Sequence, residues 1–188
     1  IRFLDFEYLN TKYTTSMRQM FKECTGLTEI KFGGDFSTAK VTNMNAMFDR
    51  CYALEDLDLS GFETGNVTTI RTMFQGCYAL ERLDLSGFDT SKITDMAYAF
   101  NKCQGLKELD ISRFDTGNVT DMRTMFQECY VLEELDVSNF DTRKVTDMAY
   151  MFNQCKTLTE LDVSGFCTEN VTNMRSMFRL CEKISKLE

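Results

Sequence analysis

The stretch LDLSGFDTSKITDMAYAFNKC, Leu83–Cys103, returns twice in the residues that follow it. The next copies read LDISRFDTGNVTDMRTMFQEC, residues 109–129, and LDVSNFDTRKVTDMAYMFNQC, residues 135–155. Leucine, aspartate, serine, phenylalanine, threonine, methionine and cysteine keep their order in all three copies. Self-similarity at a period of about 20–50 residues is typical of solenoids, in which each unit buries its apolar face against the next.

The cysteines give the length of the repeat. Seven of them lie 26 residues apart, after a first interval of 27: Cys24, Cys51, Cys77, Cys103, Cys129, Cys155 and Cys181. The extra residue falls in IKFGGDF, residues 30–36, where Gly33 and Gly34 fit a bulged turn. We therefore predict a single repeat domain over residues 1–188, with repeats at approximately 1–27, 28–53, 54–79, 80–105, 106–131, 132–157 and 158–183 and the start of another at 184–188. Because the chain begins with Ile1 and not with Met, we expect it to be a piece of a longer array.

Each copy contains two apolar patterns. LEELDVS, residues 132–138, ends in an alternation that is typical of a half-buried strand. In VTDMAYMFNQC, residues 145–155, apolar residues stand at offsets 0, 3, 6, 7 and 10, which indicates a helical stripe. Thr146 or Asp147 is suited to cap such a helix. The sequence predicts an α/β solenoid of about seven repeats, with short parallel strands on one face and short helices on the other.

The repeat resembles a known one. Its consensus, L-x-x-L-D-[LIV]-S-x-F-[DE]-T-x-x-[VI]-T-x-M-x-x-M-F-x-x-C, is similar to the 26-residue surface repeat of the BspA-like leucine-rich-repeat proteins of bacteria and some protists. The first copy departs most, with Leu9 in place of the phenylalanine. The resemblance implies a right-handed leucine-rich-repeat-like coil, an extracellular or cell-surface location, and a role in adhesion or protein binding. It implies no particular ligand.

Composition narrows the functional classes. The net charge of −8 argues against a nucleic-acid partner, which needs Lys and Arg contacts to phosphate. The sequence holds no apolar run of about 20 residues, so we expect no membrane insertion in this segment. Histidine is absent, and with it the commonest general acid–base group. Since there is also no nucleophile–base pair and no phosphate loop, we do not expect an enzyme, and we expect no cofactor.

Stacking would turn each repeated residue into a column along the solenoid. For the cysteine column, buried thiols are the main interpretation; disulfides and a metal site are alternatives, but in-line side chains suit neither disulfide geometry nor converging metal ligands. For the 12 methionines and the repeated phenylalanines, a core role competes with an adaptable binding surface. Cys167 stands where other copies carry Asp or Glu, so we expect it to be exposed, either by drift or as an intermolecular thiol.

Two acidic columns are candidates for a binding surface. They point outward from the predicted strands, and like charges on neighbouring strands are destabilising. Screening by solvent or protection against sheet aggregation accounts for them without a function. The alternative is an acidic face for a basic partner or divalent cations, comprising Asp58, Asp84, Asp110, Asp136 and Asp162 with Glu108, Glu134 and Glu160.

A longer alternation is superimposed on the repeat. Arginine and alanine alternate at one position, in Arg71, Ala97, Arg123, Ala149 and Arg175, and asparagine and lysine alternate at another, in Asn66, Lys92, Asn118, Lys144 and Asn170. We interpret this as duplication of a two-coil unit of 52 residues.

Two functional hypotheses follow. The first is a non-catalytic surface module that binds a protein partner with a basic surface through the acidic strand face. The second is a structural spacer, or a unit that self-associates through bare solenoid ends, with no ligand of its own.

Overall fold

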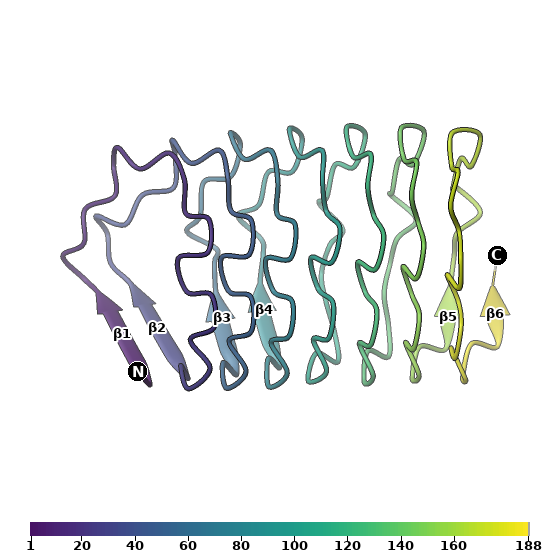
Figure 1. Ribbon diagram of the computed structural model, residues 1–188, viewed down its shortest axis with the longest axis horizontal. Helices are drawn as coiled ribbons and strands as arrows, with labels where there is room; N and C mark the ends of the chain where they lie inside the picture. The colour runs from purple at the N-terminus through teal and green to yellow at the C-terminus, as the bar shows by residue number, and fades with distance from the viewer. Residues whose placement is uncertain (188) are drawn as a thin grey trace.

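The computed structural model describes residues 1–187, and within them the chain winds into coils that lie side by side from one terminus to the other (Figure 1). One wall of the solenoid, here called the strand wall, carries short strands that pair in parallel, β1 with β2, β3 with β4 and β5 with β6. Their bounds are Phe3–Phe6 for β1, Glu29–Phe32 for β2, Asp56–Asp58 for β3, Arg82–Asp84 for β4, Glu160–Leu161 for β5 and Lys186–Leu187 for β6.

The strand register confirms the stacking of equivalent residues. In the β3–β4 pair Leu57 lies opposite Leu83 and Asp58 opposite Asp84, each 26 positions apart. The strand wall is nevertheless discontinuous, which the sequence did not predict. The equivalent residues of the fifth and sixth coils, 108–110 and 134–136, form no strand.

The prediction of helices on the opposite wall is wrong, since residues 1–187 contain no helix. The segment 145–155 is a run of turns, and so are its equivalents; we call this side the turn wall. Two residues in each coil, four positions apart, adopt φ angles of 54–73°. They are Gln19, Glu23, Ala46, Arg50, Thr72, Gly76, Tyr98, Lys102, Thr124, Glu128, Tyr150, Gln154, Ser176 and Leu180.

The hydrogen bonds of the turn wall explain why it resembles a helix in sequence. Met47 N–H donates to Met44 C=O at 3.2 Å and Cys51 N–H to Phe48 C=O at 3.1 Å, which closes two turns. Alternate amides donate to the next coil, as Ala46 does to Arg71 C=O at 2.9 Å. The turn unit is therefore four residues long and directs Met44, Met47, Phe48 and Cys51 inward. A repeat of four residues is close to the 3.6 residues per turn of an α-helix, so the apolar spacing alone did not distinguish the run of turns from a helix.

The positive φ angles lead to a prediction that distinguishes the run of turns from an α-helix, because the expected change in stability has opposite sign in the two cases. Gln154 has φ 64°, a region that costs a non-glycine residue about 1–2 kcal/mol. Gln154→Gly is expected to raise the free energy of unfolding by about 0.5–1 kcal/mol, whereas in a helix it would lower it by about 1 kcal/mol. Urea unfolding followed by circular dichroism measures the change. The column already contains a glycine, Gly76 with φ 73°. A loss of stability in the variant would contradict the turn assignment.

Backbone pairing is more continuous on the turn wall than on the strand wall. Parallel bridges join one residue of every coil to its equivalent in the next, along the whole series Ser16, Asn43, Thr69, Asp95, Asp121, Asp147 and Asn173. Thr146, proposed above as a helix cap, instead donates its hydroxyl to Thr120 C=O at 3.1 Å. Asp147 accepts the N–H of Ala149 at 2.8 Å within its own coil.

The core runs the length of the solenoid between the two walls. One phenylalanine per coil stacks on its equivalent, with ring centroids 5.2–5.8 Å apart and planes within 19° of parallel, in the series Phe21, Phe48, Phe74, Phe100, Phe126, Phe152 and Phe178. The core role predicted for phenylalanine and methionine is confirmed in the inner coils. Met20 and Met174, in the first and last coils, are 38% and 50% exposed.

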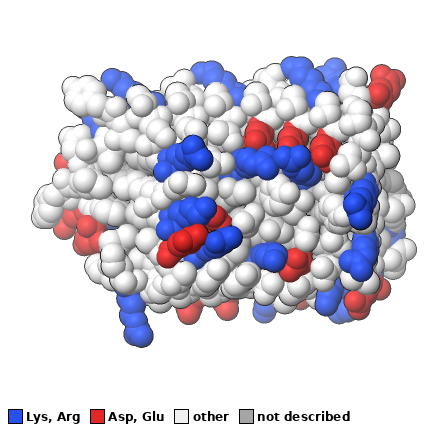
Figure 2. Space-filling view, viewed as in Figure 1, with Lys and Arg blue, Asp and Glu red and all other residues white. Residues whose placement is uncertain are grey.

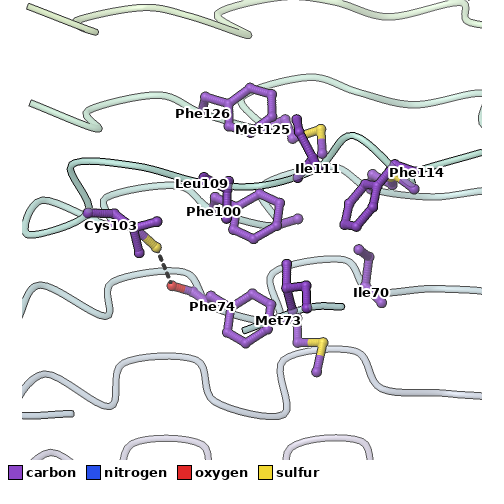
Figure 3. Close-up of a cluster of buried hydrophobic side chains, with 14 of the residues drawn as sticks. Ile70, Met73, Phe74, Phe100, Cys103, Leu109, Ile111, Phe114, Met125 and Phe126 are labelled. Atoms are coloured by element: carbon purple, nitrogen blue, oxygen red, sulfur yellow. Dashed lines mark hydrogen bonds between the residues drawn. The ribbon is translucent and has the colours of Figure 1, made fainter. Parts of the chain in front are cut away.

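The buried cysteine column is confirmed from Cys51 to Cys155, whereas Cys24 and Cys181 in the end coils are partly buried. Each thiol of the buried column has a defined partner. Figure 3 shows the thiol of Cys103 donating to the backbone carbonyl of Phe74, at 3.2 Å. The same bond joins Cys129 to Phe100 and Cys155 to Phe126. Desolvation raises the pKa of Cys129 to about 12, so this thiol stays protonated at neutral pH. The cysteines therefore link coils by hydrogen bonds and pack the core.

A buried threonine column at the corner after the phenylalanine turn provides further links between coils. Thr116 Oγ1 donates to Asp141 C=O at 3.1 Å and accepts the N–H of Asp141 at 2.8 Å. Each such hydroxyl therefore satisfies two backbone groups of the following coil. The same pair of bonds recurs at Thr38, Thr64, Thr90 and Thr142.

Candidate functional site

The predicted acidic residues are all exposed on the strand wall, but the structure does not place them all in one sheet. Asp58 and Asp84 lie opposite each other in the β3–β4 pair. Asp162 directly follows β5, and Glu160 is its first residue. The remaining four, Glu108, Asp110, Glu134 and Asp136, lie in the two segments that form no strand. The acidic residues are therefore divided between paired strands and segments that form no strand.

Each aspartate of this column is held in a turn with the serine two residues later. Asp136 Oδ1 accepts the N–H of Ser138 at 2.9 Å and its hydroxyl at 2.7 Å. Asp110 and Asp162 make the same pair of bonds with Ser112 and Ser164. The serine hydroxyl, followed by the serine N–H, lowers the pKa of these carboxyls, so they carry a fixed negative charge at neutral pH.

Removing the serine hydroxyl should raise the aspartate pKa. In Ser138→Ala the largest cause of the lowered Asp136 pKa is lost, and we expect that pKa to move up toward its ordinary value. A lowered carboxyl pKa in the folded state stabilises the fold above the ordinary pKa, and this contribution disappears as the pH falls through the lowered value. Titration of the Asp136 side-chain carbonyl signal by NMR checks the shift. Asp110, which keeps Ser112, is the internal control; an unchanged Asp136 pKa would contradict the prediction.

Opposite charges accompany every strand pair. Lys31 lies opposite Asp5 in β1–β2, with Nζ and Oδ2 3.7 Å apart. Arg82 lies opposite Asp56 in β3–β4 and donates from Nη2 to Oδ2 at 2.7 Å. In β5–β6 Glu160 is opposite Lys186. Each pair of short strands thus combines one acidic and one basic residue across the sheet.

Like charges occupy the equivalent positions where the strands are missing. Glu108 and Glu134 are equivalent, and so are Asp110 and Asp136. A backbone hydrogen bond contributes a net ~0.5–1.5 kcal/mol, and a cross-strand charge pair changes stability by about 0.2–1 kcal/mol. With strands of only two to four residues, these magnitudes are comparable. Charge is therefore large enough to decide whether such a short segment pairs.

The strand wall is hollowed next to these segments. One hollow, of about 600 Å³, lies over the third to fifth coils and is lined by Asp56, Asp58, Arg82, Asp84, Glu108 and Asp110 among others. A second, of about 430 Å³, lies over the sixth and seventh coils and is lined by Glu133, Glu134, Asp136, Glu160 and Asp162 with Leu135, Thr159 and Leu161. The charged side chains of the second hollow are all acidic.

Cys167 is partly buried, although the sequence analysis predicted exposure. Its N–H donates to Thr142 Oγ1 at 2.8 Å, and its carbonyl accepts the Thr142 hydroxyl at 3.0 Å. The residue therefore belongs to the corner of the coil, where the threonine column fixes its backbone.

The turn wall carries a polar network that was not predicted from the sequence. Arg71 Nη1 lies 3.4 Å from Asp95 and 3.5 Å from Asp121, so one guanidinium contacts carboxylates of two successive coils. The Tyr98 ring lies between Arg71 and Arg123, whose guanidinium carbons are 5.2 and 5.9 Å from its centroid. Figure 2 shows a row of acidic side chains bordered by basic ones on this face. Desolvation raises the pKa of Asp121 within this network.

The alternation in the sequence was the signal for this network. Arg71 extends along the wall past the buried Ala97 of the next coil to reach Asp121, and Arg123 reaches Asp147 in the coil of the buried Ala149. The second alternation has a similar role, since Lys92 Nζ donates to Asn66 Oδ1 at 2.8 Å and Lys144 Nζ to Asn118 Oδ1 at 2.6 Å. The two-coil unit is thus a physical unit held by side chains that reach the neighbouring coil.

These observations define a class of protein: a repeat solenoid with short parallel strands and a periodic phenylalanine and cysteine core. The family model described as "Mycoplasma protein of unknown function, DUF285" matches residues 2–108 and 94–187. The chain belongs to this family. No curated protein matches the sequence.

Two solved structures are similar over most of this chain. A leucine-rich repeat protein from Bacteroides ovatus is 19% identical with a TM-score of 0.41, covering 90% of this chain and 57% of that one. A leucine rich cell surface protein from Faecalibacterium prausnitzii is 18% identical with a TM-score of 0.30, covering 91% of this chain and 68% of that one. This chain therefore spans less than two thirds of the length of the Bacteroides protein.

Within residues 1–187, no three His, Cys, Asp or Glu side chains are grouped so as to hold a metal ion. None of these residues forms a helix of the length and apolarity needed to cross a membrane.

Proposed function

We propose that this chain is a non-catalytic binding module that recognises a protein partner with a basic surface through its strand wall. The observation that carries the proposal is the hollow over the sixth and seventh coils, whose charged lining is entirely acidic. The nearby aspartates Asp136 and Asp162 are held ionised by serine hydrogen bonds, so the negative charge is fixed in place before binding. Fixed charge of one sign favours fast and specific association with a surface of opposite charge.

We further propose a cell-surface location and a role in adhesion. The support is the repeat motif, which resembles that of BspA-like surface proteins over all copies. The net charge of −8 fits a module that attracts cationic partners.

The test removes charge from the face without changing side-chain shape. In the triple variant Asp84→Asn, Asp110→Asn and Asp136→Asn, binding of a fluorescein-labelled octalysine peptide is expected to weaken by about tenfold or more at low salt. A matched control changes three exposed acids elsewhere, Glu63→Gln, Glu169→Gln and Glu182→Gln, by the same total charge. Equal affinity of the triple variant and wild type would remove the strand wall from the proposal. Equal weakening in the control would show that only net charge matters.

A structural role is the second candidate, favoured by the distribution of exposed apolar side chains. Ile1, Tyr8 and Tyr13 of the first coil are 76–84% exposed, and Met174 and Leu187 at the other end are 50% exposed. Apolar end faces of a solenoid stack on complementary coils. Sedimentation at increasing concentration tests self-association of this chain; a strict monomer excludes end-to-end stacking and leaves a spacer role within a longer array.

A further inference from the structure

The strand wall alternates between paired and unpaired segments, and the hydrogen bonds locate the change. Leu59 N–H donates to Asp84 C=O at 3.1 Å, continuing the β3–β4 pairing by one residue. Within residues 1–187 the equivalent amides, Leu85, Ile111 and Val137, make no such bond to the following coil. Contact between coils persists at the edge of the unpaired region, where Glu133 N–H donates to Lys107 C=O at 3.1 Å. The fifth and sixth coils are therefore adjacent but not paired as strands.

The exposure of the inward leucines does not follow the pairing, since Leu83 in the paired strand β4 is partly exposed. Leu57 and Leu161, which lie in strands, are each 2% exposed. Leu109 and Leu135, in the unpaired segments, are 8% and 7% exposed. The residue types are the same, so hydrophobicity does not distinguish the two situations.

Charge differs most at the two junctions of the sixth coil. Every paired junction contains an opposite-charge pair, even β3–β4, where Asp58 also lies opposite Asp84, whereas the junctions of the sixth coil bring together only carboxylates at these positions. The residue before the central leucine forms the column Glu29, Asp56, Arg82, Glu108, Glu134, Glu160 and Lys186. Its basic members, Arg82 and Lys186, lie in the paired strands β4 and β6. Arg82 is committed to the preceding coil, because both its Nε and its Nη2 donate to Asp56 Oδ2. Lys107, the basic residue beside Glu108, stands one position earlier, in the column of Glu81 and Glu133.

We propose that the strand wall is a charge-controlled closure: residues 107–111 and 133–137 stay unpaired because carboxylates face carboxylates there, and a positive charge among them pairs these segments into the sheet. The positions that face one another are Glu108, Glu134 and Glu160 in one column and Asp84, Asp110, Asp136 and Asp162 in the other. Bound cations or a basic partner would act in the same way as Arg82 does in β4. Closure therefore extends the paired part of the strand wall across the fifth to seventh coils.

The test places a lysine at the centre of the unpaired region. Glu134→Lys is expected to slow amide hydrogen exchange of residues 107–111 and 133–137 by about fivefold or more relative to wild type, because two like-charge pairs become opposite-charge pairs. Glu160→Lys makes an opposite-charge pair with Glu134 but a like-charge pair with Lys186 in β5–β6. It is expected to protect residues 133–137 and not 107–111. Glu169→Lys, an exposed acid on a turn, has the same charge change and is expected to leave both segments unchanged.

A salt series and a second variant test whether charge, and not another property of the side chains, determines strand pairing. In wild type, amide exchange in both segments is expected to slow between 10 mM and 1 M NaCl, because the electrostatic screening length shortens from about 30 to about 3 Å. In Glu134→Lys the same change of salt is expected to alter exchange little. Arg82→Glu is expected to accelerate exchange at Leu57 and Leu83. Exchange at the turn-wall amides of Met122 and Met148 reports that each variant is folded. Unchanged exchange of residues 107–111 and 133–137 in folded Glu134→Lys would overturn the proposal. Because no partner is added, this result is independent of the octalysine binding test.

Discussion

Phe100→Ala is expected to lower the free energy of unfolding by about 3–5 kcal/mol. The Phe100 ring is fully buried and stacks on both neighbours, with centroids 5.5 Å from Phe74 and 5.6 Å from Phe126. Truncation leaves a cavity that the coils cannot close, because the turn wall fixes their spacing through a backbone bond from nearly every second residue. Urea unfolding followed by far-UV circular dichroism measures the loss.

The last coil provides a matched control for this substitution. Phe178 stacks on one neighbour only, Phe152, and is partly exposed. Phe178→Ala is therefore expected to cost less than half as much as Phe100→Ala. Similar losses at the two positions would show that the stack is not the source of the stability and would contradict the prediction.

The second large effect is expected at the buried threonine column. In Thr116→Val the side-chain shape is kept, but the N–H and C=O of Asp141 both lose their partner. Each unsatisfied buried polar group costs ~1–3 kcal/mol, so we expect a loss of about 2–4 kcal/mol. The same urea titration detects it.

Thr120, an exposed threonine four residues later in the same coil, provides the control. The hydroxyl of Thr120 makes a single bond, to Thr94 C=O at 3.1 Å, and water can replace this bond. Thr120→Val is therefore expected to change stability by ~0.5 kcal/mol or less. If Thr116→Val were equally mild, the threonine column would be a packing feature and not a set of required hydrogen bonds.

The parts of the fold that were predicted correctly depend on one property of the sequence, the register of the copies. Once equivalent residues stack, the inward positions of Phe100 and Cys103 follow from their recurrence, and the structure confirms both. The parallel pairing of residues such as Leu57 and Leu83 follows in the same way.

The wrong predictions concern features that the register of the copies does not determine. The apolar spacing of Met148, Met151 and Phe152 fits a helix and a run of four-residue turns almost equally well, and only the positive φ angles at Tyr150 and Gln154 distinguish them. Neither residue type favours that region, so neither position carries a local signal of the turn. The gap in the strand wall depends on how neighbouring coils pair, which no single repeat contains.

The acidic face was predicted as a set of exposed residues, and its members are exposed. Its hollows were not predictable, because they depend on which coils pair. The network of Arg71, Tyr98 and Asp121 was visible only as an alternation, since the reach of an arginine past a neighbouring coil is a feature of the stacked state.

The contacts of Arg71 with two successive coils restrict how such arrays can change in length. Arg71 contacts carboxylates one and two coils away, and the coil it passes carries the small Ala97 at the equivalent position. Inserting or deleting a single coil would bring two arginine coils, or two alanine–tyrosine coils, into direct contact. Adding or removing coils two at a time keeps every guanidinium beside its tyrosine and its carboxylates, so natural and engineered versions of this array should differ in size by even numbers of repeats.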